Sequence, residues 1–422
     1  MHILYFHQYF STPRGAGGIR SYEMARRLIE RGHEVTMVCG SSGSGDTGLS
    51  GGFRHGRRSG IVDGIRVIEL DLPYSNYDGF LKRSLTFIRF ALRSIWIAIT
   101  EKYDLVFATS TPLTAGIPGI AARILRQKPF VFEVRDLWPE LPREMGVISN
   151  PLVLKAMDIL EWLSYHCAKG CIGLSPGIVD GIIRRGIASG NVIMIPNGCD
   201  LELFSAKESG RTGKEFKAIF TGAHGIANGL DAVLDAAGEL KKRDRKDINL
   251  LFIGDGRLKP ALKERAAAEN LDNCLFLDPI PKNKMPDLLQ QVDAGMMILA
   301  NIPAFYYGTS PNKFFDYIAS GLPVINNYPG WIAGMITENR CGIAVQPENP
   351  AAFADALEYV VDHRDEAIAM GRNARALAKQ SFDRRKLADE FVDWLEEIGL
   401  QINALTQDAK VKNNTAIAQR RK

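Results

Sequence analysis

Short apolar runs alternate with longer amphipathic stretches along the chain, and this alternation limits the fold more than any other feature. The runs are apolar throughout, so strands formed from them are buried on both faces. Such strands, joined by helices, form parallel sheets that are covered on both sides. The strand–helix order occurs in two series, which predicts an α/β chain with two doubly wound domains. The predicted strands are Ile3–Phe6, Val35–Cys39, Leu105–Ala108, Phe130–Val134, Cys171–Leu174, Val192–Ile195, Ala218–Phe220, Asn249–Ile253, Leu275–Leu277, Ala294–Ile298, Val324–Ile325 and Ile343–Val345.

The second series begins after Pro196-Asn197-Gly198 and the polar stretch Ser205–Lys214, which places the domain boundary near residue 205. We expect one domain over 1–205 and a second over 206–382. An amphipathic helix over 383–403 should pack back on the first domain, followed by a basic flexible tail over 404–422. Gly, Ser and Arg dominate residues 40–60, which predicts a mobile loop.

Composition and charge narrow the class of protein. Hydrophobic residues make up 46% and charged residues 24% of the chain, which excludes a disordered or fibrous protein. Six scattered cysteines without a CxxC pair indicate reduced thiols in a cytosolic protein. Residues 1–200 carry a net charge of +5, residues 201–403 carry −5 and residues 404–422 carry +4. A basic front half suits an anionic partner such as a phospholipid or a phosphorylated substrate, and we expect no nucleic acid partner.

A glycine-rich loop over residues 13–20 follows the first predicted strand and opens a helix. Glycines at a helix start let backbone N–H groups approach an anion, which the helix dipole also favours. A dinucleotide site needs a GxGxxG fingerprint, but Gly15 and Gly17 are followed by Arg20 where the third glycine would stand. A nicotinamide site is therefore disfavoured, and Gly17 and Gly18 are candidate phosphate ligands. The alternative is a plain flexible turn.

A second loop, Gly308-Thr309-Ser310, leads into a helix that begins near Pro311. Ser310 is a good N-cap and Pro311 a good first helical residue. Asn312 and Lys313 would then lie in the first turn, where a phosphate binds. Asp316 follows one turn later, where a carboxylate can hold sugar hydroxyls. The alternative is an ordinary capped helix with a solvated lysine.

Two further loops follow strands. Residues 133–140 bring four charges and a tryptophan to one strand end, where Arg135 and Asp136 could orient a substrate or act as acid and base. The alternative is a salt-bridged loop.

Residues 221–231 form another glycine-rich turn, where His224 and Asn228 are candidate hydrogen-bond donors to a phosphate. A single histidine such as His224 is more often structural than catalytic.

The most apolar window, residues 80–99, is too rich in cations to span a membrane. Lys82, Thr86, Arg89 and Arg93 recur at helical spacing and predict one polar face, with Arg83 nearby. Apolar residues, Trp96 among them, fill much of the rest. A basic amphipathic helix of this kind can lie in a membrane interface; the alternative is a core helix with a solvated basic face.

The motifs, taken in order, resemble the retaining nucleotide-sugar glycosyltransferases of family 4, which have the two-domain GT-B fold. The resemblance extends from Met1 to about residue 400. Within the family, the chain looks most like the branch that builds bacterial capsule, O-antigen and exopolysaccharide repeat units. Members of that branch often use UDP-linked N-acetylated amino sugars. The motifs that carry it are RGHEVT (Arg31–Thr36), TSxPLT (Thr109–Thr114), VRDLWPE (Val134–Glu140), IPNGxD (Ile195–Asp200), IGDG (Ile253–Gly256) and SPNKxFDYxAxGxPV (Ser310–Val324).

Residue by residue, the resemblance implies a donor site with departures from the family pattern. The second Glu of the Glu-x7-Glu motif, which holds the ribose, falls at Asp316, whereas the first, which holds the donor sugar, falls at Gly308. The Arg and Lys that often bind the diphosphate fall at Ala223 and Asn228. We therefore assign the diphosphate to Gly17, Gly18, His224, Asn228, Asn312 and Lys313, the donor-sugar loop to Gly308, Thr309 and Ser310, and an orienting role to Asp136 with Arg135.

The resemblance further implies net retention at the anomeric carbon, no metal and no cofactor. The transition state is expected to be oxocarbenium-like, with leaving-group charge met by the diphosphate-binding groups. The expected partners are a UDP-sugar, a polyprenyl-diphosphate-linked saccharide and an anionic membrane surface that Lys82, Arg83, Arg89, Arg93 and Trp96 touch from the cytoplasmic side. Two other functions stay open: a nucleotide-sugar 2-epimerase on the same fold, and a non-catalytic sugar-nucleotide sensor.

Overall fold

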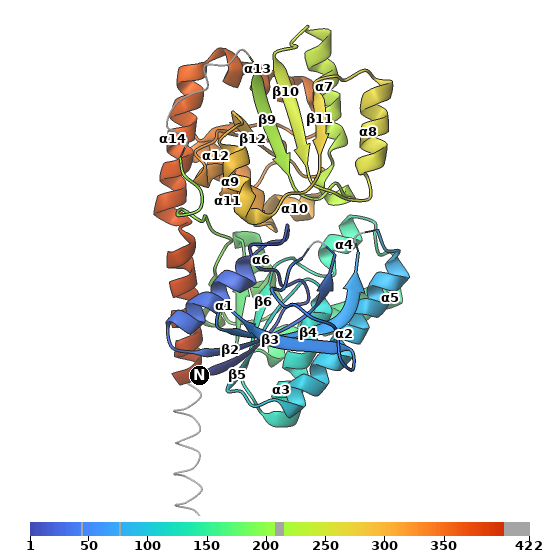
Figure 1. Cartoon of the computed structure of the whole chain (residues 1–422), viewed down its shortest axis with the longest axis vertical. Helices are drawn as coiled ribbons and strands as arrows, with labels where there is room; N and C mark the ends of the chain where they lie inside the picture. Colours follow the sequence, from blue (N-terminus) through green and yellow to red (C-terminus); the bar gives the residue numbers. More distant parts are fainter. Residues whose placement is uncertain (44, 76, 207–214, 401–422) are drawn as a thin grey trace, which may run out of the picture.

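The computed structural model describes residues 1–43, 45–75, 77–206 and 215–400. They form two α/β bodies, one above the other in Figure 1, that face each other across loops. The elements of the first are β1 (His2–Phe6), α1 (Arg20–Glu30), β2 (Glu34–Ser42), β3 (Arg57–Val62), β4 (Ile65–Tyr74), α2 (Phe80–Thr100), β5 (Leu105–Thr109), η1 (Leu113–Gly116), α3 (Ile117–Arg126), β6 (Phe130–Val134), α4 (Glu140–Glu144), α5 (Pro151–Cys167), β7 (Gly170–Gly173), α6 (Pro176–Arg184), η2 (Ser189–Asn191) and β8 (Val192–Met194).

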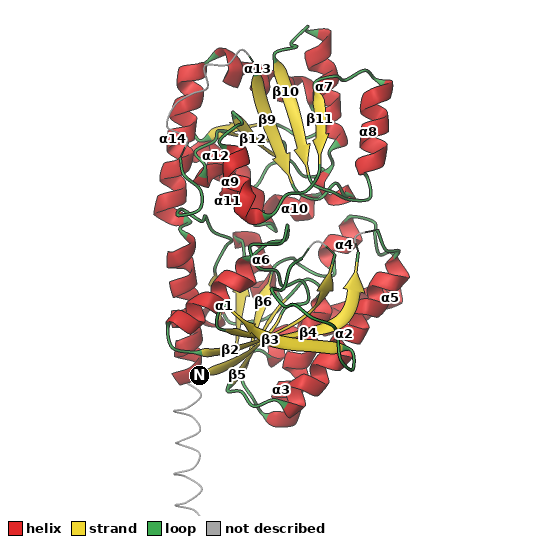
Figure 2. Cartoon of the chain, in the orientation of Figure 1, coloured by secondary structure: helices red, strands yellow, loops and turns green. Residues whose placement is uncertain are grey.

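The second body follows the same alternation of strands and helices (Figure 2). Its elements are β9 (Phe216–Thr221), η3 (Ile226–Asn228), α7 (Asp231–Lys242), β10 (Ile248–Ile253), α8 (Lys259–Ala268), β11 (Cys274–Leu277), η4 (Lys282–Lys284), α9 (Met285–Leu289), β12 (Ala294–Met297), α10 (Pro303–Tyr307), α11 (Asn312–Ala319), β13 (Val324–Asn326), α12 (Trp331–Glu338), β14 (Gly342–Ala344), α13 (Pro350–Asp362) and α14 (Arg364–Ser381).

Each body is built on one mostly or wholly parallel sheet. The first has the order β3-β4-β2-β1-β5-β6-β7-β8, in which only β3 runs antiparallel to its neighbour. The second has the order β11-β10-β9-β12-β13-β14, and its neighbouring strands pair in parallel. In both sheets the first strand lies inside the sheet, and the strand order reverses beside it. This is the doubly wound arrangement predicted from the sequence, which places ligands at the carboxyl ends of the strands.

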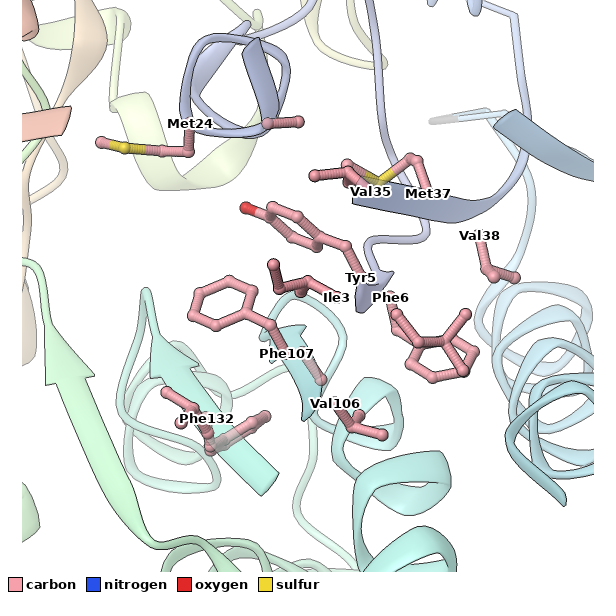
Figure 3. Close-up of a cluster of buried hydrophobic side chains, with 14 of the residues drawn as sticks. Ile3, Tyr5, Phe6, Met24, Val35, Met37, Val38, Val106, Phe107 and Phe132 are labelled. Atoms are coloured by element: carbon pink, nitrogen blue, oxygen red, sulfur yellow. The ribbon is translucent and has the colours of Figure 1, made fainter. Parts of the chain in front are cut away.

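The core of the first body surrounds its central strands (Figure 3). Tyr5 of β1 and Phe107 of β5 are fully buried, with ring centroids 4.6 Å apart in an edge-to-face arrangement. Continuous burial along β1 and β5 explains why both strands read as unbroken apolar runs. Met24 of α1 packs on the same cluster and fixes the helix that follows the glycine-rich loop.

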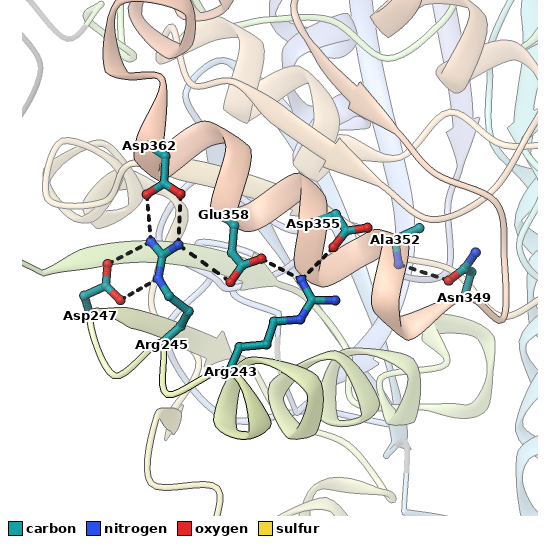
Figure 4. A network of polar contacts seen from close by, with 8 residues as sticks. All are labelled: Arg243, Arg245, Asp247, Asn349, Ala352, Asp355, Glu358 and Asp362. Carbon is teal, nitrogen blue, oxygen red and sulfur yellow. Dashed lines mark hydrogen bonds and ion pairs between the residues drawn. The ribbon is translucent and has the colours of Figure 1, made fainter.

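The second body is tied together at its outer edge by ion pairs (Figure 4). Arg243, after α7, lies 2.6 Å from both Asp355 and Glu358 of α13. Arg245 bonds both Asp247, before β10, and Asp362, at the end of α13. These pairs hold α13 against α7, far from the loops that face the first body.

A helix over 384–400 follows α14 and packs on the first body. Phe391 reaches the central sheet, with its ring 5.0 Å from that of Phe107. Arg27 of α1 pairs with Asp389 at 2.6 Å. The chain crosses between the bodies where Cys199 exchanges backbone hydrogen bonds with residues 382 and 384. The first sheet ends at Met194 and the second begins at Phe216, on either side of the boundary that we placed near residue 205.

The structure shortens the loop that we expected over residues 40–60 at both of its ends. β2 extends to Ser42, and β3 and β4 form an antiparallel hairpin that adds an edge to the first sheet. Asp63 and Gly64 form its turn with φ of 47° and 84°. Asp-Gly between apolar runs is a strong hairpin signal. The prediction of a loop followed instead from the glycines and arginines that precede this turn.

Candidate donor-binding site between the domains

A cavity of about 660 Å³ lies between the two bodies. Its C-terminal wall comes from the loops that follow β9, β10 and β11, where a doubly wound sheet binds its ligand. Its N-terminal wall comes from the glycine-rich loop and from the segment between β4 and α2. Across the cavity, the Tyr77 hydroxyl donates a hydrogen bond to Asp255 of the IGDG motif at 2.5 Å. The cavity is lined by residues of both bodies: Arg14, Gly15, Ala16, Tyr74, Ser75, Tyr77, Thr221, Gly222, Ala223, Ile253, Gly254, Asp255, Gly256, Pro279, Ile280 and Pro281, among others.

The glycine-rich loop after β1 lies against the C-terminal body. A Cβ at Gly18 would lie 3.0 Å from Nδ2 of Asn312, the first residue of α11. The adjacent Gly17 packs on Ser11, 3.4 Å from the position of a Cβ. The carbonyl of Gly15 accepts a hydrogen bond from the backbone N–H of Lys282 at 3.2 Å. The structure therefore brings together the glycine-rich loop and the N-terminus of α11, two segments to which we assigned the diphosphate.

Lys313 and Asn228, which we assigned to the same ligand, are in direct contact. Nζ of Lys313 donates to Oδ1 of Asn228 at 2.7 Å and lies 4.0 Å from the centre of the Phe220 ring. Burial lowers the pKa of Lys313 to about 7, because a poorly solvated site disfavours the ammonium form. In the described part of the chain no carboxylate lies within 4.0 Å of this lysine. Its charge is therefore available to an incoming anion.

Asp316, the predicted ribose ligand, is bound to a lysine that the sequence analysis missed. Both carboxylate oxygens accept hydrogen bonds from Nζ of Lys282 at 2.5 Å. Both side chains are nearly buried, and burial lowers the pKa of Lys282 although the carboxylate opposes that effect. The lysine comes from the loop after β11, which no motif singled out beyond its position at a strand end. A ribose held by Asp316 must share this carboxylate with Lys282.

The loop before α11 differs from the expectation in one respect. Ser310 is not the N-cap: α11 begins at Asn312, Pro311 takes the cap position, and no side chain caps the helix. The hydroxyl of Ser310 instead accepts a hydrogen bond from the backbone N–H of Asn197 at 2.9 Å, in the segment that joins the bodies. The physical reason is that this interdomain contact supplies a buried donor that needs an acceptor.

Gly308 is buried, and a Cβ there would lie 2.6 Å from the carbonyl oxygen of Ala304. The short helix α10 thus leaves no room for a side chain at the position where the family carries its first Glu. Thr309 turns back, and its hydroxyl donates to the carbonyl of Phe305 at 3.0 Å. The close packing of α10 is therefore a local reason for glycine at this position.

His224 lies inward rather than toward the cavity. Its side chain is fully buried, with ring centroids 6.0 Å from Phe220 and 6.2 Å from Phe276. Burial lowers its pKa to about 4, so the imidazole is neutral at pH 7. Neither ring nitrogen has a hydrogen-bond partner among the described residues. The structure therefore does not bring this histidine to the surface where we expected it to meet a diphosphate.

Polar groups also gather at the strand ends of the first body, across from the second. Asp136 accepts a hydrogen bond from the hydroxyl of Thr111 at 2.9 Å, and burial raises its pKa. Arg135 donates from Nη1 to Nε2 of His7 at 3.2 Å. Sequence reasoning missed His7 and the buried Gln8, although two polar residues directly after an apolar strand were a readable signal. These groups come from β1, β5 and β6, which are neighbours in the sheet.

One charge of the 133–140 cluster is structural. Glu133 is fully buried and pairs with Arg20 of α1 at 2.8 Å. Arg20 also donates to the carbonyls of Ile195 and Pro196, at 2.8 and 2.6 Å. The arginine that replaces the third glycine of a dinucleotide fingerprint thus ties α1 to β6 and to the segment between the bodies. The salt-bridged alternative holds for Glu133.

Helix α2 presents its faces in a different way from the expectation. Thr86, predicted on a solvated polar face with Lys82, Arg89 and Arg93, is buried, and its hydroxyl is satisfied by the carbonyl of Lys82 at 3.0 Å. Arg83 lies 5.5 Å from the ring of Tyr74. Lys82, Arg89 and Arg93 are exposed as expected, and several large apolar residues beside them, such as Leu85 and Leu92, are exposed as well. Short polar residues can face the core here because their hydroxyls bond to the preceding turn.

No group of three or more His, Cys, Asp or Glu side chains lies close enough to hold a metal ion in the described part of the chain. No helix within the described ranges is long and apolar enough to cross a membrane.

Comparison with known families identifies both bodies. Residues 15–198 match the family described as "Glycosyl transferase 4-like domain", and residues 203–377 match "Glycosyl transferases group 1". The D-rhamnosyltransferase WbpZ of Pseudomonas aeruginosa is 30% identical over 165 residues, which span 39% of this chain and 41% of the relative. The chain thus spans less than half of that relative's length. A putative colanic acid biosynthesis glycosyl transferase of Escherichia coli, WcaI, is 22% identical over 402 residues, 89% of this chain and 95% of the relative.

Solved structures agree on the fold. Anabaena HepE in complex with UDP and glucose has a TM-score of 0.67 at 16% identity, covering 93% of this chain and 99% of that chain. WaaG, a glycosyltransferase involved in lipopolysaccharide biosynthesis, has a TM-score of 0.66 at 14% identity, covering 93% and 98%. The similarity at these identities confirms the predicted fold class. The chain belongs to the GT-B glycosyltransferases, with a glycosyl transferase 4-like domain followed by a group 1 domain.

Proposed function

We propose that this protein transfers an N-acetylated amino sugar from a UDP-sugar to a polyprenyl-diphosphate-linked saccharide, with retention, in the synthesis of a bacterial surface polysaccharide. The transfer takes place at the cytoplasmic face of the membrane. The observation that carries the proposal is the meeting of the two bodies beside the interdomain cavity. The glycine-rich loop lines that cavity and approaches Asn312, the first residue of α11, and the side chain of Lys313 lies next to Gly222 of the cavity wall. The UDP complexes of the structural neighbour HepE support a nucleotide-sugar donor.

The chemistry follows from the groups at the two walls. Lys313 and the N–H groups at the start of α11 stabilise the negative charge that grows on the departing diphosphate. In a front-face reaction that phosphate takes the acceptor proton, so no strong protein base is required. Asp136, held by Thr111, orients the donor sugar. Both family matches and the relatives named above are transferases, so the 2-epimerase alternative has no support.

A thermal-shift panel of UDP, GDP and ADP tests the donor assignment. UDP is expected to stabilise the wild type and not Asp316→Ala, each compared with its own ligand-free melting temperature. Asp316→Ala leaves Lys282 unpaired, so the double variant Asp316→Ala/Lys282→Met removes both charges and protects the fold. Asp316→Glu keeps the carboxylate and should retain the response. A response to GDP or ADP instead of UDP would overturn the donor class.

Consumption of the donor distinguishes the remaining functions. A transferase consumes UDP-sugar only when the lipid-linked saccharide is present, and the product keeps the anomeric configuration of the donor. An epimerase converts the donor without an acceptor. A sensor binds UDP and consumes nothing. The last two results would each refute the proposed transfer.

A further inference from the structure

Helix α2 exposes a continuous apolar stripe. Its residues recur every three or four positions, which places them on one side of the helix. Leu81 is 82% exposed and Trp96 is 67% exposed. On a soluble surface such a stripe is costly unless something covers it. Its members are Leu81, Leu85, Ile88, Leu92, Trp96 and Ile99.

Helices near α2 in the same domain also carry exposed apolar residues. α2 packs against α3, and α3 packs against α5 (Figure 1), on the side of the domain away from the helix that follows α14. Both neighbours carry exposed apolar side chains. These are Ile124 and Leu125 on α3, and Leu152, Ile159 and Trp162 on α5.

A basic groove of about 940 Å³ borders the stripe. Leu92 and Trp96 of the stripe line it together with Arg54 and Arg57. Arg93 also lines the groove, and its guanidinium donates to the carbonyl of Gly56 at 3.2 Å. The groove thus joins cations and apolar side chains at one edge of α2.

The turn before β3 places two of these arginines side by side. Arg54 and Arg57 are antiparallel bridge partners across a turn in which His55 and Gly56 have φ of 51° and 72°. Like charges directly opposite each other on such a pair destabilise it. Within the described ranges no carboxylate lies within 4.0 Å of Arg54, Arg57 or Arg93, whereas Arg58 pairs with Glu69 at 2.9 Å. The arrangement is suited to an anion that the chain itself does not supply.

We infer that the stripe and the groove dock the N-terminal domain on a bilayer that contains anionic phospholipid. The apolar side chains of α2 lie in the interface, and Arg54 and Arg57 contact lipid phosphates. The inference rests on the proposed function, which places the acceptor in the same membrane. The docking also orients the protein on the membrane. Because α2 begins three residues after Tyr77, which lines the donor cavity, docking through α2 brings the mouth of the cavity close to the lipid surface.

Vesicle flotation tests the docking surface, with phosphatidylcholine vesicles prepared with and without phosphatidylglycerol. Wild type is expected to float with the anionic vesicles and to be released by salt. Arg54→Gln/Arg57→Gln should lower the partition coefficient about 30-fold, at roughly 5-fold per cation. Leu92→Ser/Trp96→Ser should also lower it. The matched controls Lys263→Gln/Arg372→Gln and Leu275→Ser change exposed residues of the C-terminal body and should bind like wild type.

Several results would overturn the inference. Wild type that stays unbound on anionic vesicles refutes it, as does equal binding to neutral vesicles. Stripe variants that bind like wild type place the contact elsewhere. The wild type could instead be a dimer in light scattering and fail to bind vesicles. If Leu92→Ser/Trp96→Ser then dissociates the dimer, the stripe binds a second copy of the chain and not a membrane. The UDP thermal shift, measured without vesicles, separates the two proposals, because it tests the donor site alone and both docking variants should keep it.

Discussion

The desolvated ammonium of Lys313 predicts a specific pH dependence of nucleotide binding. In the free protein the pKa of Lys313 is about 7. A bound diphosphate raises it, because an adjacent anion favours the charged form. Between pH 7 and the raised pKa the complex holds more protons than the free protein, so the affinity for UDP falls as the pH rises through this window.

The size of the effect follows from the free lysine. With a pKa of about 7, the protonated fraction is one half at pH 7 and about 0.01 at pH 9, so the affinity should fall roughly 50-fold between these values if the raised pKa exceeds 9. At pH 8, binding should take up about 0.9 proton per UDP. The phosphate itself contributes little, because its second ionisation, near pH 6, is largely complete above pH 7.

Titration calorimetry in two buffers of different ionisation enthalpy measures both the affinity and the proton uptake. Lys313→Met removes the titrating group, so its weaker binding should be independent of pH between 7 and 9. An affinity for UDP that is flat over this range in the wild type would refute the assignment of Lys313 to the diphosphate. The same slope in wild type and Lys313→Met would show that another group titrates.

Two stability predictions concern the same site. Lys282→Met leaves the nearly buried Asp316 without its partner and should lower the free energy of unfolding, measured in urea, by about 3 kcal/mol or more. The control Lys284→Met, at an exposed neighbour, should change this free energy little. Equal losses in the two variants would contradict the pairing of Lys282 with Asp316. Gly308→Ala places a Cβ 2.6 Å from a backbone oxygen and should cost about 1–3 kcal/mol. Gly225→Ala, which meets open space, is its control, and a loss at Gly308 no larger than that of the control would contradict the close packing.

Local sequence signals predicted the strands well, and failed where two signals competed. All twelve apolar runs correspond to strands of the structure, because buried parallel strands are apolar on both faces. The β3–β4 hairpin was missed because glycines and arginines hid the Asp63-Gly64 turn. Helix α2 was found over the correct residues, and Lys82, Arg89 and Arg93 are exposed as expected, but Thr86 is buried and the leucines are exposed.

The candidate site shows the same division at the level of single residues. The sequence located Lys313 and Asp316 on one helix that begins next to Pro311, which depends only on residue spacing and on the preference of proline for a helix start. It could not show that Lys282, more than 30 residues earlier, donates to Asp316. Nor could it show that Ser310 bonds to Asn197 instead of capping α11. These pairings join segments far apart in the chain, and no local pattern encodes them.

The sequence by itself determined the fold class and the positions of the glycine-rich loops at strand ends, because hydrophobic periodicity and glycine placement are local properties. Only the tertiary structure decided which groups are available to a ligand. Burial turned His224 inward, lowered the pKa of Lys313 and paired Glu133 with Arg20. Packing also decided which side of α2 meets solvent. The physical reason is that solvation and charge pairing depend on the three-dimensional neighbours of a side chain, which the order of residues along the chain does not state.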